Sequence, residues 1–515
     1  MSPVLLFSFV IGYFLVLLWV AWRTSRNSNN ESFFIGNRNS NWMLVAFGMV
    51  GTSLSGVTFV SVPGTVGDFA GNSFKAFGYF QVVIGNWIGL MVIAFVLLPL
   101  YYRLNLVSIY NYLHSRFGNT AYKTGSLFFI ISRTVGATAR LYLVINVLHI
   151  FILKELGVPF ALTTFIILVM ILLYTFEGGV KTIVYTDTLQ TSFMLLGLVV
   201  CIVYIIQHMG MSFGGVLQAL DEKGYTRIFN TDFQSKGFFV KQIIGGMFIM
   251  IAMTGLDQEM MQKNISVKNL KDSQKNVLSF SVVMVVVNLL FLLLGGLLYL
   301  FILHNGAAYH DQQVMHNGVA SAGHQLLLNG HNVIGDDLFP TLVLHYLPKA
   351  VSIIFIIALI SALFPSADGA LTALTSSFCI DLLDLKNKPG LGEQQKKRTR
   401  MMVHISFAIL FLCCILFFKW IDNKSIINVI LDLAGYTYGP LLGLFAFGIF
   451  TKRQLPDSWK ITAICLLAPT SCYFISQHAA HWFGGFQIGI ELLLINGILT
   501  FLGLLIISKK PVPTN

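Results

Sequence analysis

The sequence predicts an all-α polytopic membrane protein with about 13 transmembrane helices, and its composition and hydropathy are the observations that predict this class. Of its 515 residues, 56% are hydrophobic and 11% are charged, and the mean hydropathy is +0.75. The core of a soluble domain cannot absorb so much apolar surface. Apolar runs of about 18 residues or more recur along the whole chain, and each can cross a hydrocarbon layer of about 30 Å as a helix.

The apolar runs define the expected spans in chain order. The first run lacks the basic n-region and the small-residue cleavage site of a signal peptide, so we expect it to remain as a helix. The expected spans are residues 3–22, 41–70, 76–101, 122–150, 157–176, 183–208, 240–262, 276–303, 349–383, 402–419, 425–450, 458–476 and 485–508.

The distribution of basic residues predicts the orientation of the spans. With the N-terminus outside and the C-terminus inside, the inner loops carry more than twice as many Lys and Arg residues as the outer loops. Cytoplasmic loops retain such an excess, so the pattern favours N-out, C-in and an odd number of spans. The net charge of +11 and the pI of 9.3 therefore reflect topology, and we expect no nucleic-acid partner. The densest basic run, 396–400, is most simply a cytoplasmic loop anchor.

The cysteines indicate neither disulfides nor a metal framework, because all of them fall inside expected spans, where they act as small apolar residues. They are Cys201, Cys379, Cys413, Cys414, Cys465 and Cys472.

The outer segment 304–336 contains five histidines and no Lys or Arg. Their spacing is wider than the two to five residues typical of metal ligands on one element. We therefore expect a solvated, partly mobile loop there rather than a zinc site.

The sequence contains no motif of a membrane enzyme. HExxH of zinc proteases, the GxSxG nucleophile elbow and a Gly-rich phosphate loop followed by Lys are all missing. We therefore expect a protein that is not an enzyme and has no cofactor.

Two spans carry polar and helix-breaking residues near their middle. Residues 47–64, FGMVGTSLSGVTFVSVPG, and 245–263, GGMFIMIAMTGLDQEMMQK, lie five spans apart. Lipid tolerates such interruptions where they face a cavity or bind something, and paired broken helices point to an inverted-repeat transporter. The alternative is a pair of Gly-rich packing helices, since small residues also mediate helix contacts.

Seven segments in order resemble the sodium/solute symporter family, whose members carry sugars, amino acids, monocarboxylates, vitamins, iodide or sialic acid. The segments are FFIGNRNSNW (33–42), SGVTFVSVPG (55–64), SIYNYLHSRFG (108–118), GGVKTIVYTDTLQ (178–190), GLDQ (255–258), SADGALTALTSSFCIDLL (366–383) and LAGYTYGPLLGLF (433–445).

The resemblance implies the inverted-repeat fold named after LeuT, with a discontinuous first helix in each repeat. The leading helix and its cytoplasmic loop would occupy 1–40. Two inverted five-helix repeats, 41–208 and 240–450, would flank an outer loop at 209–239. Two C-terminal helices and a short tail would occupy 451–515.

The resemblance also implies a sodium site between the break of the first repeat helix and the eighth core helix. The carbonyl ligands map onto Gly51, Leu54 and Ala362, the hydroxyl onto Ser366, and a nearby acid onto Asp187. Sodium is a hard cation that prefers several oxygen ligands.

The chain departs from the family pattern at Pro365, which stands where the family usually has a Ser or Thr ligand. The proline removes one ligand hydroxyl but also frees a carbonyl one turn earlier, at Ser361. Proton coupling through Asp187 or Asp368 is therefore the alternative to sodium coupling, and Asp368 could equally be a structural acid.

By analogy with the family, the substrate lies beside the two breaks. Its candidate ligands are Thr52, Ser53, Ser55, Tyr79, Gln81, Arg133, Arg140, Thr254, Asp257 and Tyr436.

Arg133 and Arg140 are the most suggestive of these candidates, because a buried guanidinium needs an acid of the bundle or a ligand carboxylate as its partner. An anionic solute is one interpretation. In the other, Arg133 snorkels to the cytoplasm and Arg140 pairs with an acid. A galactose-type sugar site would require a Glu in span 76–101 and a Lys in span 276–303, and neither is present.

We expect a secondary active transporter of the bacterial inner membrane that imports a small organic solute, possibly anionic, by sodium symport. The alternatives are a proton-coupled symporter of the same fold, a channel, and a non-transporting solute sensor. The chain ends shortly after its last span, so we expect no signalling domain. We expect no obligate protein partner.

Overall fold

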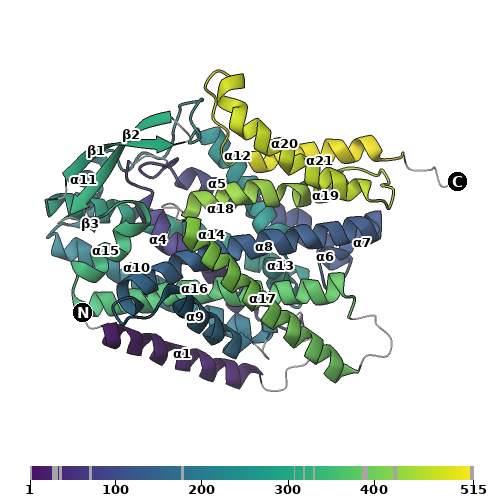
Figure 1. The fold of residues 1–515 in the computed structure, drawn as a ribbon, viewed down its shortest axis with the longest axis horizontal. Helices are drawn as coiled ribbons and strands as arrows, with labels where there is room; N and C mark the ends of the chain where they lie inside the picture. Colours follow the sequence, from purple (N-terminus) through teal and green to yellow (C-terminus); the bar gives the residue numbers. More distant parts are fainter. Residues whose placement is uncertain are drawn as a thin grey trace.

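The computed structural model describes residues 3–25, 33, 38–68, 72–175, 179–306, 308–316, 319–328, 331–385, 392–421 and 426–510. Parts of the sequence motifs at 33–42 and 178–190 lie outside these residues. The described chain is a helical bundle with one small β-hairpin (Figure 1).

The described part of the first half of the chain consists of helices and the loops that join them. Its helices are α1 (Pro3–Ser25), α3 (Trp42–Ser53), α4 (Gly56–Gly64), α5 (Phe80–Val92), α6 (Leu98–Arg103), α7 (Asn111–Phe117), α8 (Asn119–Leu148), α9 (Phe160–Thr175), α10 (Gly179–His208) and α11 (Phe213–Glu222).

The second half continues the bundle and contains the three strands β1 (Ala308–His316), β2 (Val319–Leu328) and β3 (His331–Asn332). Its helices are α12 (Phe239–Met250), α13 (Gln258–Ile265), α14 (Leu270–His304), α15 (Leu338–His345), α16 (Lys349–Ser377), α17 (Glu393–Ile421), α18 (Ile426–Thr437), α19 (Gly439–Phe450), α20 (Lys460–Trp482) and α21 (Leu492–Ile507).

Each expected span contains one helix or one pair of bent helices. Seven helices in the described part of the chain are long and apolar enough to cross a membrane, and ten spans result if each bent pair counts as one. The predominantly helical membrane fold is thus confirmed, whereas the count of 13 crossings, the N-out, C-in orientation and the boundaries of the repeats stay predictions. The start of α1 and the end of α21 lie at opposite ends of the bundle (Figure 1).

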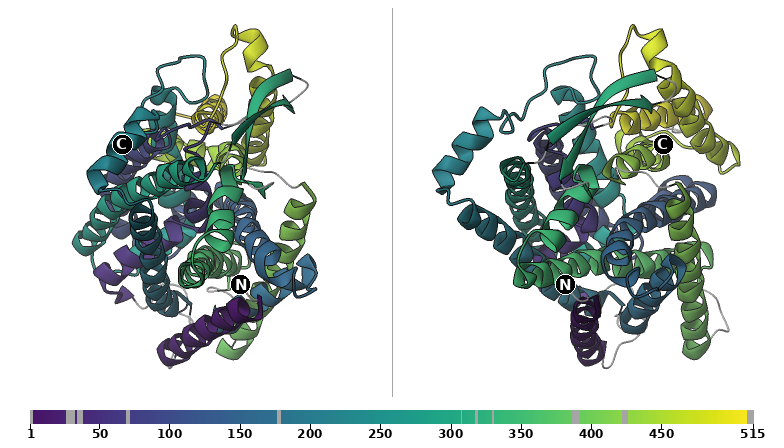
Figure 2. Two further views of the ribbon diagram at one scale, coloured as in Figure 1. Left: turned by 90° about the vertical axis from the view of Figure 1, so that its left-hand side faces the viewer. Right: turned by 60° about the vertical axis from the view of Figure 1, so that its left-hand side comes forward.

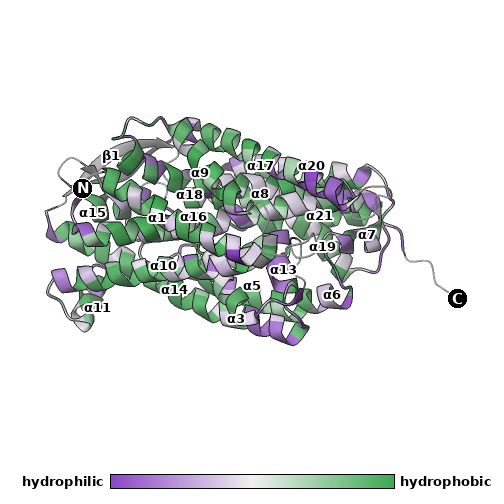
Figure 3. Ribbon diagram, turned by 90° about the horizontal axis from the view of Figure 1, so that it is seen from below, coloured by the Kyte–Doolittle hydropathy of each residue, from purple (hydrophilic) through white to green (hydrophobic). Residues whose placement is uncertain are grey.

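Hydrophobic and hydrophilic residues are separated along the length of the bundle. Green, hydrophobic ribbon runs along α1, α10, α14 and α17, whereas purple residues gather at the end of the bundle near α7 and the C-terminus (Figure 3). This is the distribution that a lipid belt requires.

Three spans are bent at a break. The angle is 53° between α3 and α4, 65° between Phe239–Gly255 and α13, and 45° between Val429–Thr437 and α19. The first two breaks confirm the interruptions predicted from the sequence, and the third was not predicted.

Glycines allow close packing of the elements around these breaks. A Cβ atom at Gly85 on α5 would overlap the carbonyl of Ile243 on α12, and one at Gly246 would lie 2.6 Å from the carbonyl of Val82. Small residues that face each other bring two helix backbones together, so α5 and α12 form one unit.

The structure corrects one expectation, because the segment expected to be a loop at 304–336 contains a β-hairpin. Strand β1 pairs antiparallel with β2 from Ala308↔Leu327 to His316↔Val319, and β3 extends the sheet. Seen end-on, the hairpin lies across the near end of the bundle (Figure 2, left). Strand pairing satisfies the backbone polar groups that an irregular loop would leave to water.

Candidate functional site

The break between α3 and α4 lies against α16. Leu54 leaves the helical conformation with φ −85° and ψ 64°, and α4 begins again at Gly56. The last carbonyls of a helix have no partner within the helix, so this break presents oxygens to whatever faces it. A Cβ atom at Gly56 would lie 4.0 Å from the carbonyl oxygen of Ala362, so the break faces the part of α16 that contains Ala362 and Ser366.

α16 is continuous through Pro365 from Lys349 to Ser377. The Ser366 hydroxyl donates to the carbonyl of Leu363 at 2.9 Å. Asp368 accepts a hydrogen bond from the Tyr174 hydroxyl at 2.9 Å, as a structural acid would. Four of the five predicted sodium ligands, Gly51, Leu54, Ala362 and Ser366, therefore belong to the break and the helix that packs against it.

Asp187, the predicted acid, is fully buried on α10 beside the last turn of α3. A Cβ atom at Gly48 would lie 3.1 Å from the Asp187 Cβ, so only a small residue fits there. Asp187 Oδ2 accepts hydrogen bonds from Thr52 Oγ1 at 3.1 Å and from Lys263 Nζ at 2.7 Å. Its Oδ1 has no hydrogen-bond partner in the described part of the chain.

Two charged residues of the site, Lys263 and Glu259, were not predicted from the sequence; they lie four residues apart on α13. Both are buried, and their charged atoms are 3.6 Å apart. Two charges at i and i+4 directly after a predicted break were the signal that could have identified them, because residues at this spacing share a helix face.

Arg133 on α8 pairs with acids of the bundle and does not snorkel to the cytoplasm. Its guanidinium donates to Glu259 and lies 3.9 Å from Asp257 Oδ2. Asp257 also caps α13, because its Oδ1 accepts the backbone N–H of Glu259 at 2.9 Å and that of Met260 at 3.3 Å. The positive end of a helix stabilises a carboxylate in this position.

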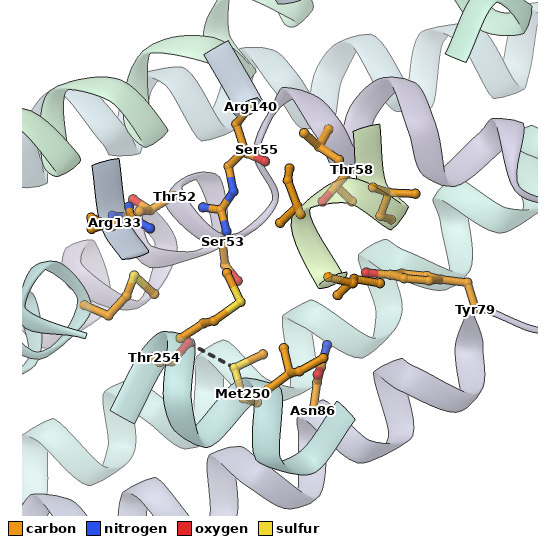
Figure 4. A pocket seen from close by; sticks show the side chains of 17 residues that line it. Thr52, Ser53, Ser55, Thr58, Tyr79, Asn86, Arg133, Arg140, Met250 and Thr254 are labelled. Atoms are coloured by element: carbon orange, nitrogen blue, oxygen red, sulfur yellow. Dashed lines mark hydrogen bonds between the residues drawn. The ribbon is translucent and has the colours of Figure 1, made fainter. Parts of the chain in front are cut away.

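A cavity opens beside the two breaks, with about 720 Å³ of empty space including the part open to solvent (Figure 4). Seven of the ten predicted substrate residues line it. They are Thr52, Ser53, Ser55, Tyr79, Arg133, Arg140 and Thr254. Met253 and the α18 side chains Ile427, Ile430 and Leu431 add an apolar wall.

The other three predicted residues lie elsewhere. Gln81 is fully buried and accepts the backbone N–H of Asn230 at 3.2 Å, which fixes the segment before α12. Asp257 does not line the cavity and instead contacts Arg133, which does, and Tyr438. Tyr436 lines a separate cavity together with Asp432 and Tyr473.

Arg140 is the unpaired cation of the cavity. Its side chain extends from α8 toward Ser53 (Figure 4), and it forms no hydrogen bond or ion pair with any described residue. By contrast, Arg133, about two turns earlier on the same helix, is paired with Glu259.

Comparison with known proteins identifies the family. The model of the sodium:solute symporter family matches residues 33–455. The chain belongs to the sodium:solute symporter family. It is 22% identical to the sodium/sialic acid symporter SiaT of Proteus mirabilis, over 87% of this chain and 85% of the relative. It is also 22% identical to the sodium/sialic acid symporter NanT of Aliivibrio fischeri, over 92% of this chain and 88% of the relative.

Solved structures of symporters share the fold. The outward-open structure of a Na⁺-coupled sialic acid symporter superposes with a TM-score of 0.78 at 18% identity and covers 97% of both chains. Mhp1, a nucleobase-cation symporter, gives a TM-score of 0.54 at 12% identity over 93% of both chains.

Membership of the sodium:solute symporter family confirms several predictions. The chain is a multi-pass membrane protein and a sodium-coupled solute transporter, not an enzyme. The bacterial relatives and the apolar spans agree with an inner-membrane location. The roles of individual residues stay predictions.

Proposed function

We propose that this transporter imports a small anionic organic solute together with sodium, by alternating access around the central cavity. The observation that carries the proposal is Arg140, a cation that lines the cavity and forms no hydrogen bond or ion pair with the described residues. An unpaired guanidinium in a bundle core is costly, and an anionic ligand would remove that cost.

The lining of the cavity suits a solute with a carboxylate at one end and polar groups along its length. The planar guanidinium of Arg140 can bind a carboxylate through two parallel hydrogen bonds. Ser53, Ser55 and Thr254 supply hydroxyls, and the α18 side chains supply an apolar wall. Two relatives are sodium/sialic acid symporters, so sialic acid, an acidic sugar, is the first solute to test.

The sodium ion would lie between the break of the first repeat and α16. Gly51, Leu54 and Ala362 would contribute backbone carbonyls. Ser366 would contribute its hydroxyl oxygen, whose lone pairs are available while the O–H donates to Leu363. Unwound carbonyls of broken helices hold sodium in transporters of this kind. Pro365 supplies no hydroxyl, so the site relies more on carbonyls.

Coupling would follow from the position of these groups on one element. Sodium would hold the last turn of α3 against α16, and the same turn presents Ser53 to the cavity. Each ligand would then order groups that the other needs, which makes the two bindings cooperative. Release of sodium to the cytoplasm would free the solute.

Uptake into proteoliposomes tests the proposal. We expect an inward sodium gradient to drive accumulation of radiolabelled sialic acid or another carboxylate of a small panel, and a potassium gradient not to do so. Neutral sugars should not compete. Uptake that is indifferent to sodium, or that a proton gradient drives instead, would refute sodium coupling.

Arg140→Gln isolates the role of the guanidinium. We expect the variant to lose at least about tenfold in affinity for the anion, since a charge-assisted pair is worth about 1.5–3 kcal/mol. Arg23→Gln, which removes an exposed arginine of α1, is the matched control and should transport normally.

A further inference from the structure

Lys263 links α13, the second half of one broken helix, to α3, the first half of the other, and to α10. Its ammonium group on α13 donates to Thr52 Oγ1 on α3 at 2.6 Å and to Asp187 Oδ2 on α10 at 2.7 Å. The Lys263 side chain is 4% exposed and that of Asp187 is fully buried. A buried cation thus occupies the position beside Asp187 that a coupling ion would also favour.

The buried charges around Lys263 do not balance. Four acids lie in this part of the bundle, Asp187, Asp257, Glu259 and Asp368. Three cations lie near them: Lys263 and Arg133, which form ion pairs with these acids, and Arg140, which forms none with the described residues. Asp187 Oδ1 and Glu259 Oε1 are buried without a hydrogen-bond partner among the described residues. Unsatisfied carboxylate oxygens in a low dielectric attract a further cation strongly.

Thr52 connects this cluster to the predicted sodium site. It lies between Gly51 and Leu54, whose carbonyls are expected to bind sodium, and its hydroxyl accepts from Lys263. An ion that binds Asp187 Oδ2 would have to displace an ammonium group held by two hydrogen bonds. The groups that hold Lys263 and the groups that would hold sodium therefore overlap on the last turn of α3.

We propose that Lys263 is a tethered cation that competes with the coupling sodium ion for the Asp187 carboxylate and so sets the sodium affinity of the transporter. The inference rests on the proposed function. When sodium takes the carboxylate, the ammonium group leaves Thr52 and Asp187, and α13 is released from α3 and α10. When sodium departs, Lys263 again donates to Thr52 and Asp187, and α13 is again held to α3 and α10.

Equilibrium binding of radioactive sodium to the purified full-length protein tests the competition. Lys263→Gln keeps hydrogen-bond donors for Asp187 and Thr52 but removes the charge, and Lys263→Met removes both. We expect either variant to bind sodium more tightly than the wild type, by on the order of tenfold. In the wild type, sodium can bind only in the fraction of molecules in which Lys263 does not occupy the Asp187 carboxylate, and this lowers the apparent sodium affinity. A purely structural lysine would give the opposite result, since its loss would loosen the site and weaken binding.

A double-mutant cycle with Asp187→Asn locates the competition. In the Asp187→Asn background, Lys263→Gln should change sodium affinity little, because the contested carboxylate is gone. The unfolding temperature in sodium-free buffer gives a second readout, in which the two substitutions should also be coupled. Lys275→Gln, which removes the exposed partner of Asp272, is the matched control.

The outcomes separate this inference from the proposed function. Unchanged or weaker sodium binding in both Lys263 variants would overturn the competition while a sodium-binding wild type would leave the symport proposal intact. Failure of both variants to fold would assign Lys263 a structural role and also overturn it. Sodium binding in neither the wild type nor the variants would overturn both proposals.

Discussion

The hydroxyl of Tyr438 donates a hydrogen bond to Asp257 Oδ2 at 3.1 Å, although the two residues are 181 positions apart. Tyr438 stands between α18 and α19, where the third bent span turns by 45°, and Asp257 caps α13, where the second turns by 65°. One carboxylate therefore ties two bends together. Movement at either bend has to preserve or break this hydrogen bond.

Tyr438→Phe removes the donor and leaves Asp257 Oδ2 with Arg133, 3.9 Å away. We expect the free energy of unfolding to fall by about 1–3 kcal/mol, the usual cost of leaving a buried acceptor unsatisfied. Unfolding of the detergent-solubilised protein, followed by tryptophan fluorescence, measures the change. Tyr185→Phe, at an exposed tyrosine of α10, is the control, and equal losses in the two variants would contradict the role of the hydrogen bond.

Two of the three bends could be predicted from the sequence. Gly and hydroxyl residues around Leu54 and Gly255 predicted two breaks correctly, because such residues interrupt a lipid-facing helix. The third break was missed, although Pro440 cannot donate a hydrogen bond to the carbonyl of Tyr436. Asn496 on α21 donates to that carbonyl at 2.9 Å and to that of Gly435 at 3.0 Å. The partner comes from a distant helix, so local pattern could not reveal it.

The hairpin was missed for a different reason. Asn-Gly pairs at 317–318 and 329–330 separate the strand segments in the sequence, and Asn-Gly is the strongest short hairpin signal. The spacing of the histidines and the polar composition of the segment favoured a solvated loop instead.

Among the site residues, the sequence found both arginines of α8 but could not assign their partners. Whether Arg133 or Arg140 meets an acid depends on where α13 lies, and Glu259 reaches only Arg133. The packing of α13 against α8 is a tertiary property that no local spacing encodes.

The Arg133–Glu259 pair gives a second prediction. Glu259→Gln leaves the Arg133 guanidinium buried beside Asp257 alone, so we expect a loss of about 3–5 kcal/mol in the free energy of unfolding. The double variant Arg133→Met with Glu259→Met should recover most of this loss, because it removes both charges and keeps apolar volume. Thermal unfolding of the single and double variants measures the coupling. Additive losses would show that the two side chains do not act as a pair.

Asp457, in the loop before α20, gives a prediction about pH. Hydrogen bonds from Thr120, joined by the backbone N–H of Asn119, hold the pKa of this carboxyl below its ordinary value. Asp457 therefore acts as a cap on the first turn of α8. Since its folded-state pKa is depressed, this cap stabilises the protein fully above the unfolded pKa of about 3.9, and the stabilisation is lost as the pH falls through the folded pKa.

Asp457→Ala should therefore cost about 0.5 kcal/mol at neutral pH, the low end of capping effects, since the group is exposed. The difference in unfolding temperature from the wild type should shrink as the pH falls below about 4. Glu155→Ala, at an exposed acid between α8 and α9, is the control. A difference that stays constant with pH would exclude the carboxylate as the cap.

The central claim, that sodium binds where the break of α3 meets Ala362 and Ser366, is tested most directly by equilibrium binding of radioactive sodium to the purified protein beside Ser366→Ala. Ser406→Ala on α17, whose hydroxyl also donates within its own helix, is the control. We predict saturable binding to the wild type and the control, and affinity weaker on the order of tenfold in Ser366→Ala, the loss of one ligand hydroxyl. No saturable binding at millimolar sodium, or equal affinity in wild type and Ser366→Ala, would contradict the assigned site.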